Sequence, residues 1–124
     1  MKFKVMVCDD SKLMRKKLKN FLELSYKDID VLVAENGKNA VEVYEAEKPN
    51  LVFLDIVMPI LDGIGALKLI KAFDNDAKVV ITSSSGTKQK LKEALESGAV
   101  EFIQKPWTED KIKFVVDKFM SEGE

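Results

Sequence analysis

The sequence predicts an α/β fold in which five strands alternate with five helices around a doubly wound, parallel sheet. Two observations carry this prediction. Short apolar runs recur along the chain, and a longer stretch with helical periodicity follows each of them. Most of the runs are apolar without alternation, which is typical of strands that are buried on both faces of a parallel sheet. Because crossovers between parallel strands are right-handed, we expect helices on both faces.

The predicted strands are the apolar runs themselves. Four of the five are rich in Val, Ile, Leu or Phe, as buried parallel strands are. Their ranges are Phe3–Cys8, Val31–Ala34, Leu51–Leu54, Val79–Thr82 and Glu101–Ile103.

A helix is expected after each strand because apolar residues recur there at helical spacing. The last helix follows the i, i+3, i+4, i+7 pattern most closely. From the first helix to the last, the apolar positions are Met14, Leu18, Phe21 and Leu22; Ala40, Val41 and Tyr44; Leu67, Ile70 and Phe73; Leu91, Ala94 and Leu95; and Ile112, Val115, Val116 and Phe119.

Turn and capping residues agree with this division of the chain. Asn36-Gly37 precedes the second helix, and Pro49-Asn50 precedes the third strand. Gly98 follows the fourth helix, where glycine is the favoured residue at a helix C-terminus. Thr108 is placed to accept a hydrogen bond as the N-cap of the last helix.

The length and composition are those of one globular domain. The chain has 124 residues, of which 46% are hydrophobic and 33% charged, so we expect a single domain over residues 1–124 with no output domain. The net charge is −1, and a nucleic-acid partner is not expected. We interpret a basic group on the first helix as a solvated face. Its members are Lys12, Arg15, Lys16, Lys17 and Lys19.

Residue counts narrow the chemistry further. Cys8 is the single cysteine, which excludes an internal disulfide and fits a reducing compartment, and we expect it in the core. No apolar segment is long enough for a signal peptide or a membrane span, so we expect a cytoplasmic protein without a membrane partner. Histidine is absent, which excludes histidine bases, histidine metal ligands and a phosphohistidine on this chain.

Polar groups stand at the carboxyl ends of four predicted strands, where doubly wound sheets bind their ligands. Three of them are carboxylates, Asp9, Asp10 and Asp55. If they converge, their repulsion favours a hard divalent cation, and oxygen ligands suit Mg²⁺, with the main-chain carbonyl of Val57 as a further ligand. The alternative is that Asp9 or Asp10 merely caps the first helix.

Asp55 is the candidate nucleophile because it emerges from a buried strand, and carboxylates form aspartyl-phosphates. Ser83 offers a hydroxyl and Lys105 an ammonium to phosphoryl oxygens. Pro106 fixes the backbone after Lys105, and a cis bond there would aim the lysine inward. The plainer interpretations are a helix-start hydroxyl, for which Ser84 and Ser85 would serve as well, and a surface lysine.

The chain resembles the receiver domain of response regulators, in its single-domain, CheY-like form, over almost its whole length. The residues that carry the likeness are Asp9-Asp10, Asp55, Met58-Pro59, Asp62-Gly63, Ser83 and Lys105-Pro106. The resemblance implies a flavodoxin-like sheet with strand order 2-1-3-4-5.

The resemblance also implies roles for single residues. Asp9 and Asp10 would hold Mg²⁺, Asp55 would accept phosphate, and Lys105 would pair with the phosphoryl group. Ser83, which lies 22 positions before Lys105 as the family's switch hydroxyl does, would move toward that group. Phe102 would be the switch aromatic, although the family more often has Tyr there.

In function, the resemblance implies a response regulator of two-component signal transduction, without enzymatic activity beyond its own phosphotransfer and autodephosphorylation. A sensor histidine kinase would be the phosphodonor. The start of the first helix is similar to chemotaxis members, so the flagellar motor switch is the expected target, with a phosphatase as a further partner and a monomeric state. Met14 and Lys17 are candidates for a kinase-docking surface, and Val57 and Ser85 for tuning dephosphorylation.

Three alternatives remain at this point. A phosphorelay intermediate would pass its phosphate to a histidine phosphotransfer protein. A pseudo-receiver would keep the fold as an interaction module without phosphorylation, although the complete set of site residues argues against it. An enzyme with an aspartate nucleophile, such as a dehalogenase-type phosphatase, typically needs a second Asp where this chain has Val57, and is disfavoured.

Overall fold

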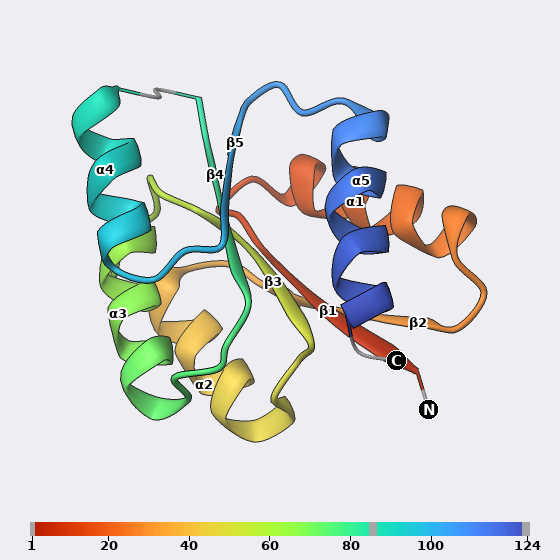
Figure 1. Ribbon diagram of the computed structural model, residues 1–124, viewed down its shortest axis with the longest axis horizontal. Helices are drawn as coiled ribbons and strands as arrows, with labels where there is room; N and C mark the ends of the chain where they lie inside the picture. The colour runs from red at the N-terminus through yellow and green to blue at the C-terminus, as the bar shows by residue number, and fades with distance from the viewer. Residues whose placement is uncertain (1, 85–86, 123–124) are drawn as a thin grey trace.

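The computed structural model describes residues 2–84 and 87–122. Five parallel strands form one sheet in the order β2-β1-β3-β4-β5, as expected (Figure 1). The strands are β1 (Phe3–Cys8), β2 (Ile29–Ala34), β3 (Leu51–Asp55), β4 (Val79–Ser83) and β5 (Glu101–Gln104). The helices are α1 (Lys12–Ser25), α2 (Gly37–Glu47), α3 (Gly63–Phe73), α4 (Lys88–Glu96) and α5 (Glu109–Glu122).

Every predicted strand is present, and the observed strands differ from the predicted ones only at their ends. β2 begins two residues before the predicted Val31, because Ile29 and Asp30 pair in register with Phe3 and Lys4 of β1. The alternation of apolar and polar residues at Ile29–Asp30 reflects the edge position of β2, which has a neighbour on one side only. The other strands β3, β4 and β5 run one residue further than predicted, so Asp55 and Ser83 are the last residues of their strands.

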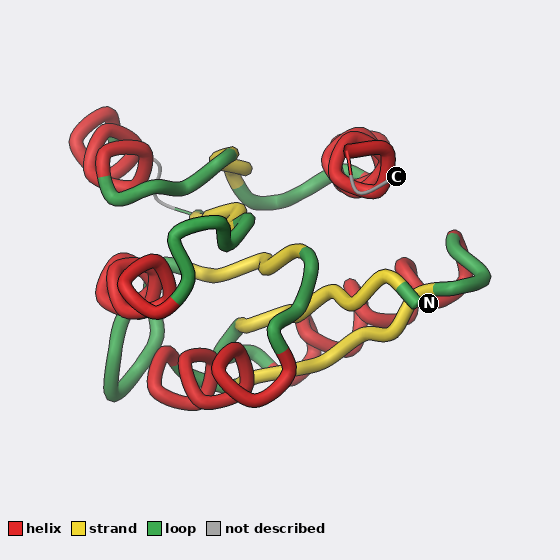
Figure 2. Tube along the Cα trace, turned by 60° about the horizontal axis from the view of Figure 1, so that its bottom comes forward, coloured by secondary structure: helices red, strands yellow, loops and turns green. Residues whose placement is uncertain are grey.

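Helices cover both faces of the sheet, α1 and α5 on one and α2, α3 and α4 on the other (Figures 1 and 2). Each face has its own apolar core, and the central strand supplies both. Val52 and Leu54 of β3 belong to the core under α2, α3 and α4, whereas Leu51 and Phe53 belong to the core under α1 and α5. The apolar run in β3 is therefore uninterrupted because each of its faces is buried.

Helix α4 departs from the predicted pattern. Leu91 and Leu95, expected with Ala94 on its buried face, are 37% and 48% exposed, and Ala94 alone is fully buried. The small side chain of Ala94 faces the core, which leaves the larger residues at the margin of the contact. This helix is short, and its N-cap is Thr87, whose Oγ1 accepts from the Lys90 N–H at 3.2 Å.

The predicted capping residues Gly98 and Thr108 are confirmed, whereas Gly37, predicted to precede the second helix, is the first residue of α2, with Asn36 as its N-cap. Gly98 follows α4 with a φ of +103°, and a Cβ at that position would also lie 2.8 Å from the side chain of Lys71. Thr108 accepts from the Lys111 N–H at 3.2 Å and caps α5. Among the described residues, no helix is long and apolar enough to span a membrane.

Candidate functional site

Three carboxylates meet at the carboxyl edge of the sheet. Asp9 follows β1 and Asp55 ends β3, which are neighbouring strands, and Asp10 adjoins Asp9. One oxygen from each of the three lies within 4.8 Å of the others. Asp9 and Asp55 are buried, whereas Asp10 is exposed. The convergence expected from the strand ends is therefore present, and we call this group the acidic triad.

The N-cap of α1 is Ser11, not one of the two aspartates. Its Oγ accepts from the Met14 N–H at 3.3 Å. Asp9 does take one main-chain donor nearby, since its Oδ1 accepts from the Ser11 N–H at 2.9 Å. Helix capping therefore does not account for the adjacent pair, and Asp10 is left to face the other two carboxylates.

Lys105 lies across the triad rather than on the surface. Its Nζ donates to Asp9 Oδ2 at 2.6 Å and to Asp55 Oδ2 at 3.1 Å, and its side chain is 15% exposed. The Lys105-Pro106 peptide bond is cis, as the sequence suggested. The Lys105 N–H also donates to the Ser83 carbonyl at 2.7 Å, which ties the residue to the end of β4.

Burial and neighbouring charges shift the pKa values of the site. Burial raises the pKa of Asp55 above its ordinary value; Lys105 works in the opposite direction, and the charges of Asp9 and Asp10 add to the rise. Burial alone would lower the pKa of Lys105, but its hydrogen bond to Asp9 and the charge of Asp55 outweigh it, so the net pKa is raised. Lys105 therefore stays a cation beside carboxylates that repel one another.

An open pocket of about 440 Å³ gives access to these groups. The acidic triad, Lys105 and Pro106 line it together with Met14 and Val57. The Val57 side chain is 61% exposed at its rim. A pocket with three acidic groups, one ammonium and an apolar rim suits a cation together with a small anionic group.

Comparison with known proteins decides the family. The response regulator receiver domain family matches residues 5–117. The chain belongs to this family. This receiver is 43% identical over 108 residues to the chemotaxis protein CheY of Halobacterium salinarum, covering 87% of this chain and 88% of that one. It is 36% identical over 121 residues to the CheY of Bacillus subtilis, covering 98% and 100%.

Solved structures agree with the family. A complex of CheX and CheY with BeF3 and Mg²⁺ from Borrelia burgdorferi matches the receiver with a TM-score of 0.84 and 34% identity, over 98% of this chain and 90% of that one. The receiver domain of the Francisella response regulator 1452 matches with a TM-score of 0.88 and 29% identity, over 98% of each chain.

The serines at the end of β4 and just after it divide between the core and the pocket. Ser83, the expected switch hydroxyl, is 1% exposed at the end of β4. Ser84 is exposed and lines the pocket. Ser85, which the sequence offered as an alternative, lies outside the described residues. The receiver thus holds Ser83 one residue deeper than the hydroxyl that borders the site.

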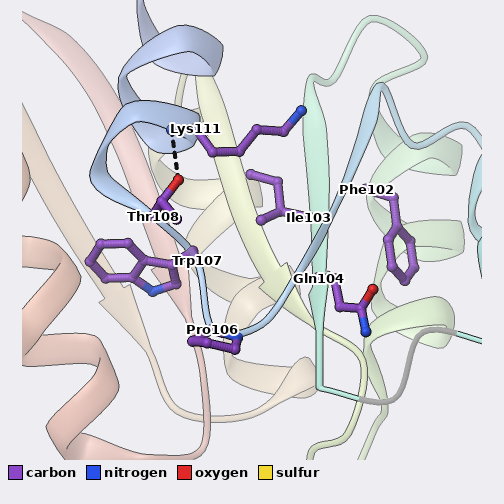
Figure 3. A pocket seen from close by; sticks show the side chains of 7 residues that line it. All are labelled: Phe102, Ile103, Gln104, Pro106, Trp107, Thr108 and Lys111. Atoms are coloured by element: carbon purple, nitrogen blue, oxygen red, sulfur yellow. Dashed lines mark hydrogen bonds between the residues drawn. The ribbon is translucent and has the colours of Figure 1, made fainter.

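Phe102 and Trp107 lie on different sides of the last strand. Figure 3 shows Phe102 on the α4 side of β5 and Trp107 turned toward α1. Phe102 is half-buried and packs against the core under α2, α3 and α4. The Trp107 ring lies 6.0 Å from the Phe21 ring, and the Lys17 ammonium lies 5.6 Å from its centroid. Trp107 therefore packs against α1.

A second pocket, of about 270 Å³, lies between β5 and the start of α5, beneath Trp107. Figure 3 shows Lys111 extending along one side of it, past Ile103. Gln104 and Thr108 contribute its polar groups. The two pockets share Pro106 as a lining residue.

The structural role of Gly63 was not predicted from the sequence. Its N–H donates to the Ile56 carbonyl at 2.8 Å, and a Cβ at that position would lie 2.1 Å from the Asp55 carbonyl oxygen. No side chain fits there, so the start of α3 can pack directly on the backbone that carries Asp55. The Asp62-Gly63 pair was a signal of the family, but its physical reason is this close approach.

Arg15 corrects the interpretation of the basic group on α1 as a solvated face. Lys12, Lys16 and Lys17 are exposed as expected, but Lys19 is half-buried. Arg15 is half-buried as well, and its Nη1 donates to the Asp9 carbonyl at 2.7 Å. Its spacing of six residues from Asp9 lets it reach back over the first turn, which composition alone does not reveal.

Cys8 is a core residue, as expected. Its Sγ lies 3.3 Å from the Met58 sulfur and 3.4 Å from the Asn36 carbonyl oxygen. Burial, reinforced by the charges of Asp9 and Asp55, raises the pKa of the Cys8 thiol to about 12. The thiol is therefore protonated and unreactive at neutral pH.

Proposed function

We propose that this receiver is a chemotaxis response regulator that accepts a phosphoryl group on Asp55 in a reaction that requires Mg²⁺. The observation that carries the proposal is the acidic triad, three carboxylates within 4.8 Å with the Lys105 ammonium bound to two of them. The chemotaxis role rests on the named relatives, which span nearly the whole chain. The chain acts as a signalling protein rather than as an enzyme with turnover.

The donor set fits a hard divalent cation. All three side-chain groups are carboxylates, and Asp9, Asp10 and Asp55 would hold Mg²⁺ together with the main-chain carbonyl of Val57. When bound, Mg²⁺ would neutralise negative charge on the phosphoryl oxygens and on the triad. The solved Borrelia burgdorferi complex contains Mg²⁺ and BeF3, which supports the same metal here.

Asp55 is placed to act as the nucleophile. Lys105 binds its Oδ2, and among residues 2–84 and 87–122 no group donates a hydrogen bond to its Oδ1. An Asp55 oxygen would attack the phosphorus of a phosphohistidine on a sensor histidine kinase. The new O–P bond forms as the N–P bond breaks, and the electron pair leaves with the imidazole of the donor. The mixed anhydride then remains on Asp55.

Lys105 would stabilise the transferred group. Its ammonium lies between Asp9 and Asp55, so a short movement would bring it to a phosphoryl oxygen. Its raised pKa keeps it charged throughout the neutral range. Ser83 would supply a hydroxyl from the end of β4 to another phosphoryl oxygen.

The output of the switch would be a change in a protein-binding surface. Phe102 would move inward as Ser83 moves toward the phosphoryl group, altering the face formed by α4, β5 and α5. The expected target is a protein such as the flagellar motor switch, and the expected setting is the cytoplasm, with a monomeric chain. A phosphatase is a further partner, since the Borrelia burgdorferi homologue was solved with CheX.

The test is Mg²⁺-dependent phosphorylation with acetyl phosphate, followed by intact-protein mass spectrometry. The wild type should gain one phosphoryl group with Mg²⁺ and none with EDTA, and Asp55→Asn should gain none in either condition. A wild type that gains nothing would support the interaction-module alternative. Rapid transfer from the phosphorylated chain to a histidine phosphotransfer protein would support the relay alternative over the chemotaxis role.

A further inference from the structure

We propose that Arg15 is a positioning residue for the acidic triad, one that holds the peptide between Asp9 and Asp10. The inference rests on the proposed function, because it gives Arg15 a task in the cation site described above. Arg15 lies in the first turn of α1, half-buried, and its main-chain N–H bonds the Ser11 carbonyl at 3.0 Å. From there its Nη1 donates to the Asp9 carbonyl oxygen at 2.7 Å.

Asp9 has several other contacts that fix it. Its Oδ1 accepts from the Ser11 N–H at 2.9 Å and its Oδ2 from Lys105 at 2.6 Å. Its N–H donates to the Ala34 carbonyl at 3.2 Å. The Asp9 carboxylate would therefore keep its place without Arg15, and the bond from Arg15 must be explained by what lies on the other side of the peptide.

Asp10 has no such contacts. It is exposed, and within residues 2–84 and 87–122 its carboxylate makes no hydrogen bond or ion pair. Its direction depends on the backbone from which it projects. The peptide group is planar, so the Asp9 carbonyl and the Asp10 nitrogen and Cα share one rigid unit. By binding that carbonyl, the Arg15 guanidinium fixes the plane from which the Asp10 side chain starts.

Arg15 could act on the triad by positioning it or by its positive charge. The two roles predict opposite effects on cation affinity when Arg15 is removed. Arg15 brings a positive charge near the triad, and if its charge were its main effect, removing it would strengthen cation binding. If positioning dominates, removing it lets the Asp10 carboxylate turn away, and cation binding weakens. Residues that orient metal ligands commonly alter affinity by tenfold or more when changed, so we expect positioning to prevail.

The experiment measures Mn²⁺ binding to the full chain by electron paramagnetic resonance of the free ion. Arg15→Met keeps the aliphatic packing and removes the donor and the charge, and its dissociation constant should rise on the order of tenfold. Arg15→Lys keeps the charge without the planar fork, and should bind roughly threefold more weakly than the wild type. Lys16→Met removes one charge from the exposed neighbouring position and should bind at least as tightly as the wild type.

Each result decides between the accounts. Wild-type or tighter binding by Arg15→Met overturns the positioning role while leaving the proposed function intact. A wild type that fails to bind Mn²⁺ overturns the proposed function, and this inference with it. If thermal unfolding in EDTA shows that Arg15→Met is not folded, Arg15→Lys still decides, since the charge account predicts wild-type affinity for it.

Discussion

Two aspartates at opposite ends of the sheet have pKa values that are shifted in opposite directions. Asp55, at the carboxyl end, is buried beside two further carboxylates, and burial raises its pKa. Asp74 follows α3 at the amino end of β4, where its Oδ2 accepts from the Tyr44 hydroxyl at 2.7 Å. That hydrogen bond lowers the pKa of Asp74. The fold satisfies Asp74 within itself, whereas the triad around Asp55 stays in mutual repulsion.

The surroundings of Asp74 have the character of a packing site. The buried Tyr44 ring meets Phe73 edge to face, with centroids 6.3 Å apart, and the Lys48 ammonium lies 5.8 Å from the Phe73 centroid. We call these four residues, Tyr44, Lys48, Phe73 and Asp74, the Tyr44 cluster. It joins α2 to α3 through a hydrogen bond and ring contacts. The contrast teaches that clustered like charges, rather than an aspartate as such, mark the functional end.

The largest effect is expected from a substitution at the acidic triad. Lys105→Met removes the ammonium that contacts Asp9 and Asp55. The phosphorylation rate with acetyl phosphate at saturating Mg²⁺ should fall on the order of 100-fold, because the group that stabilises developing charge is lost. Rates followed by phosphoprotein mass spectrometry check this, with Lys111→Met, whose ion pair lies on β5 and α5, as the matched control. A rate within twofold of the wild type would remove Lys105 from the chemistry.

Binding of Mg²⁺ should stabilise the acidic triad. Mg²⁺ should raise the free energy of unfolding of the wild type, by about 2.7 kcal/mol at a concentration one hundred times its dissociation constant. Asp55→Asn should gain much less, because one of three carboxylates is missing. Urea unfolding with and without Mg²⁺ measures both. Equal stabilisation of the two proteins would place the cation elsewhere.

A substitution at Tyr44 should disrupt the Tyr44 cluster and leave the acidic triad intact. Tyr44→Phe removes the hydroxyl that donates to Asp74, and the free energy of unfolding should fall by about 1 kcal/mol, the usual contribution of one hydrogen bond. Phosphorylation of Asp55 should be unchanged, because the two regions lie at opposite ends of the sheet. Urea unfolding and phosphorylation rates on the same preparation provide the check; a slowed phosphorylation would show that the two ends are coupled.

The smallest effect concerns pH in the metal-free protein. Because the folded pKa of Asp55 is raised above the ordinary value of 3.8, the folded state binds the proton more tightly than the unfolded state. The contribution of Asp55 to stability is therefore largest at low pH and is lost as the pH rises through the folded pKa.

Asp55→Asn has no ionisable group at position 55, so it does not lose stability there as the pH rises. In EDTA its stability relative to the wild type should increase between pH 4 and pH 7, as followed by urea unfolding at each pH. A constant difference in stability between the two proteins across that range would show that burial and the neighbouring carboxylates do not raise the pKa of Asp55.

Much of this architecture follows from the sequence because its causes are local. Runs such as Leu51–Leu54 indicate buried strands, and the carboxyl ends of parallel strands meet at one edge, so the meeting of Asp9, Asp10 and Asp55 could be predicted. The inward position of the Lys105 side chain was predicted from the proline that follows it and from the family resemblance.

The rest depends on packing between distant segments. Gly63 is required because α3 starts against the backbone of Asp55, and Arg15 reaches a carbonyl outside its helix. The exposure of Leu91 and Leu95 follows from how α4 sits on the sheet. None of these contacts leaves a periodic pattern, so apolar spacing and charge counts could not reveal them.

The most direct measurement of the central claim locates the phosphoryl group itself. The wild type would be phosphorylated with acetyl phosphate and Mg²⁺, and the acyl phosphate reduced with borohydride, which converts a phosphorylated aspartate to homoserine. Peptide mass spectrometry should then find homoserine at position 55 and unmodified Asp9 and Asp10. Homoserine at position 9 or 10, or at no position in a folded sample, would contradict the assignment of Asp55 as the phosphoacceptor.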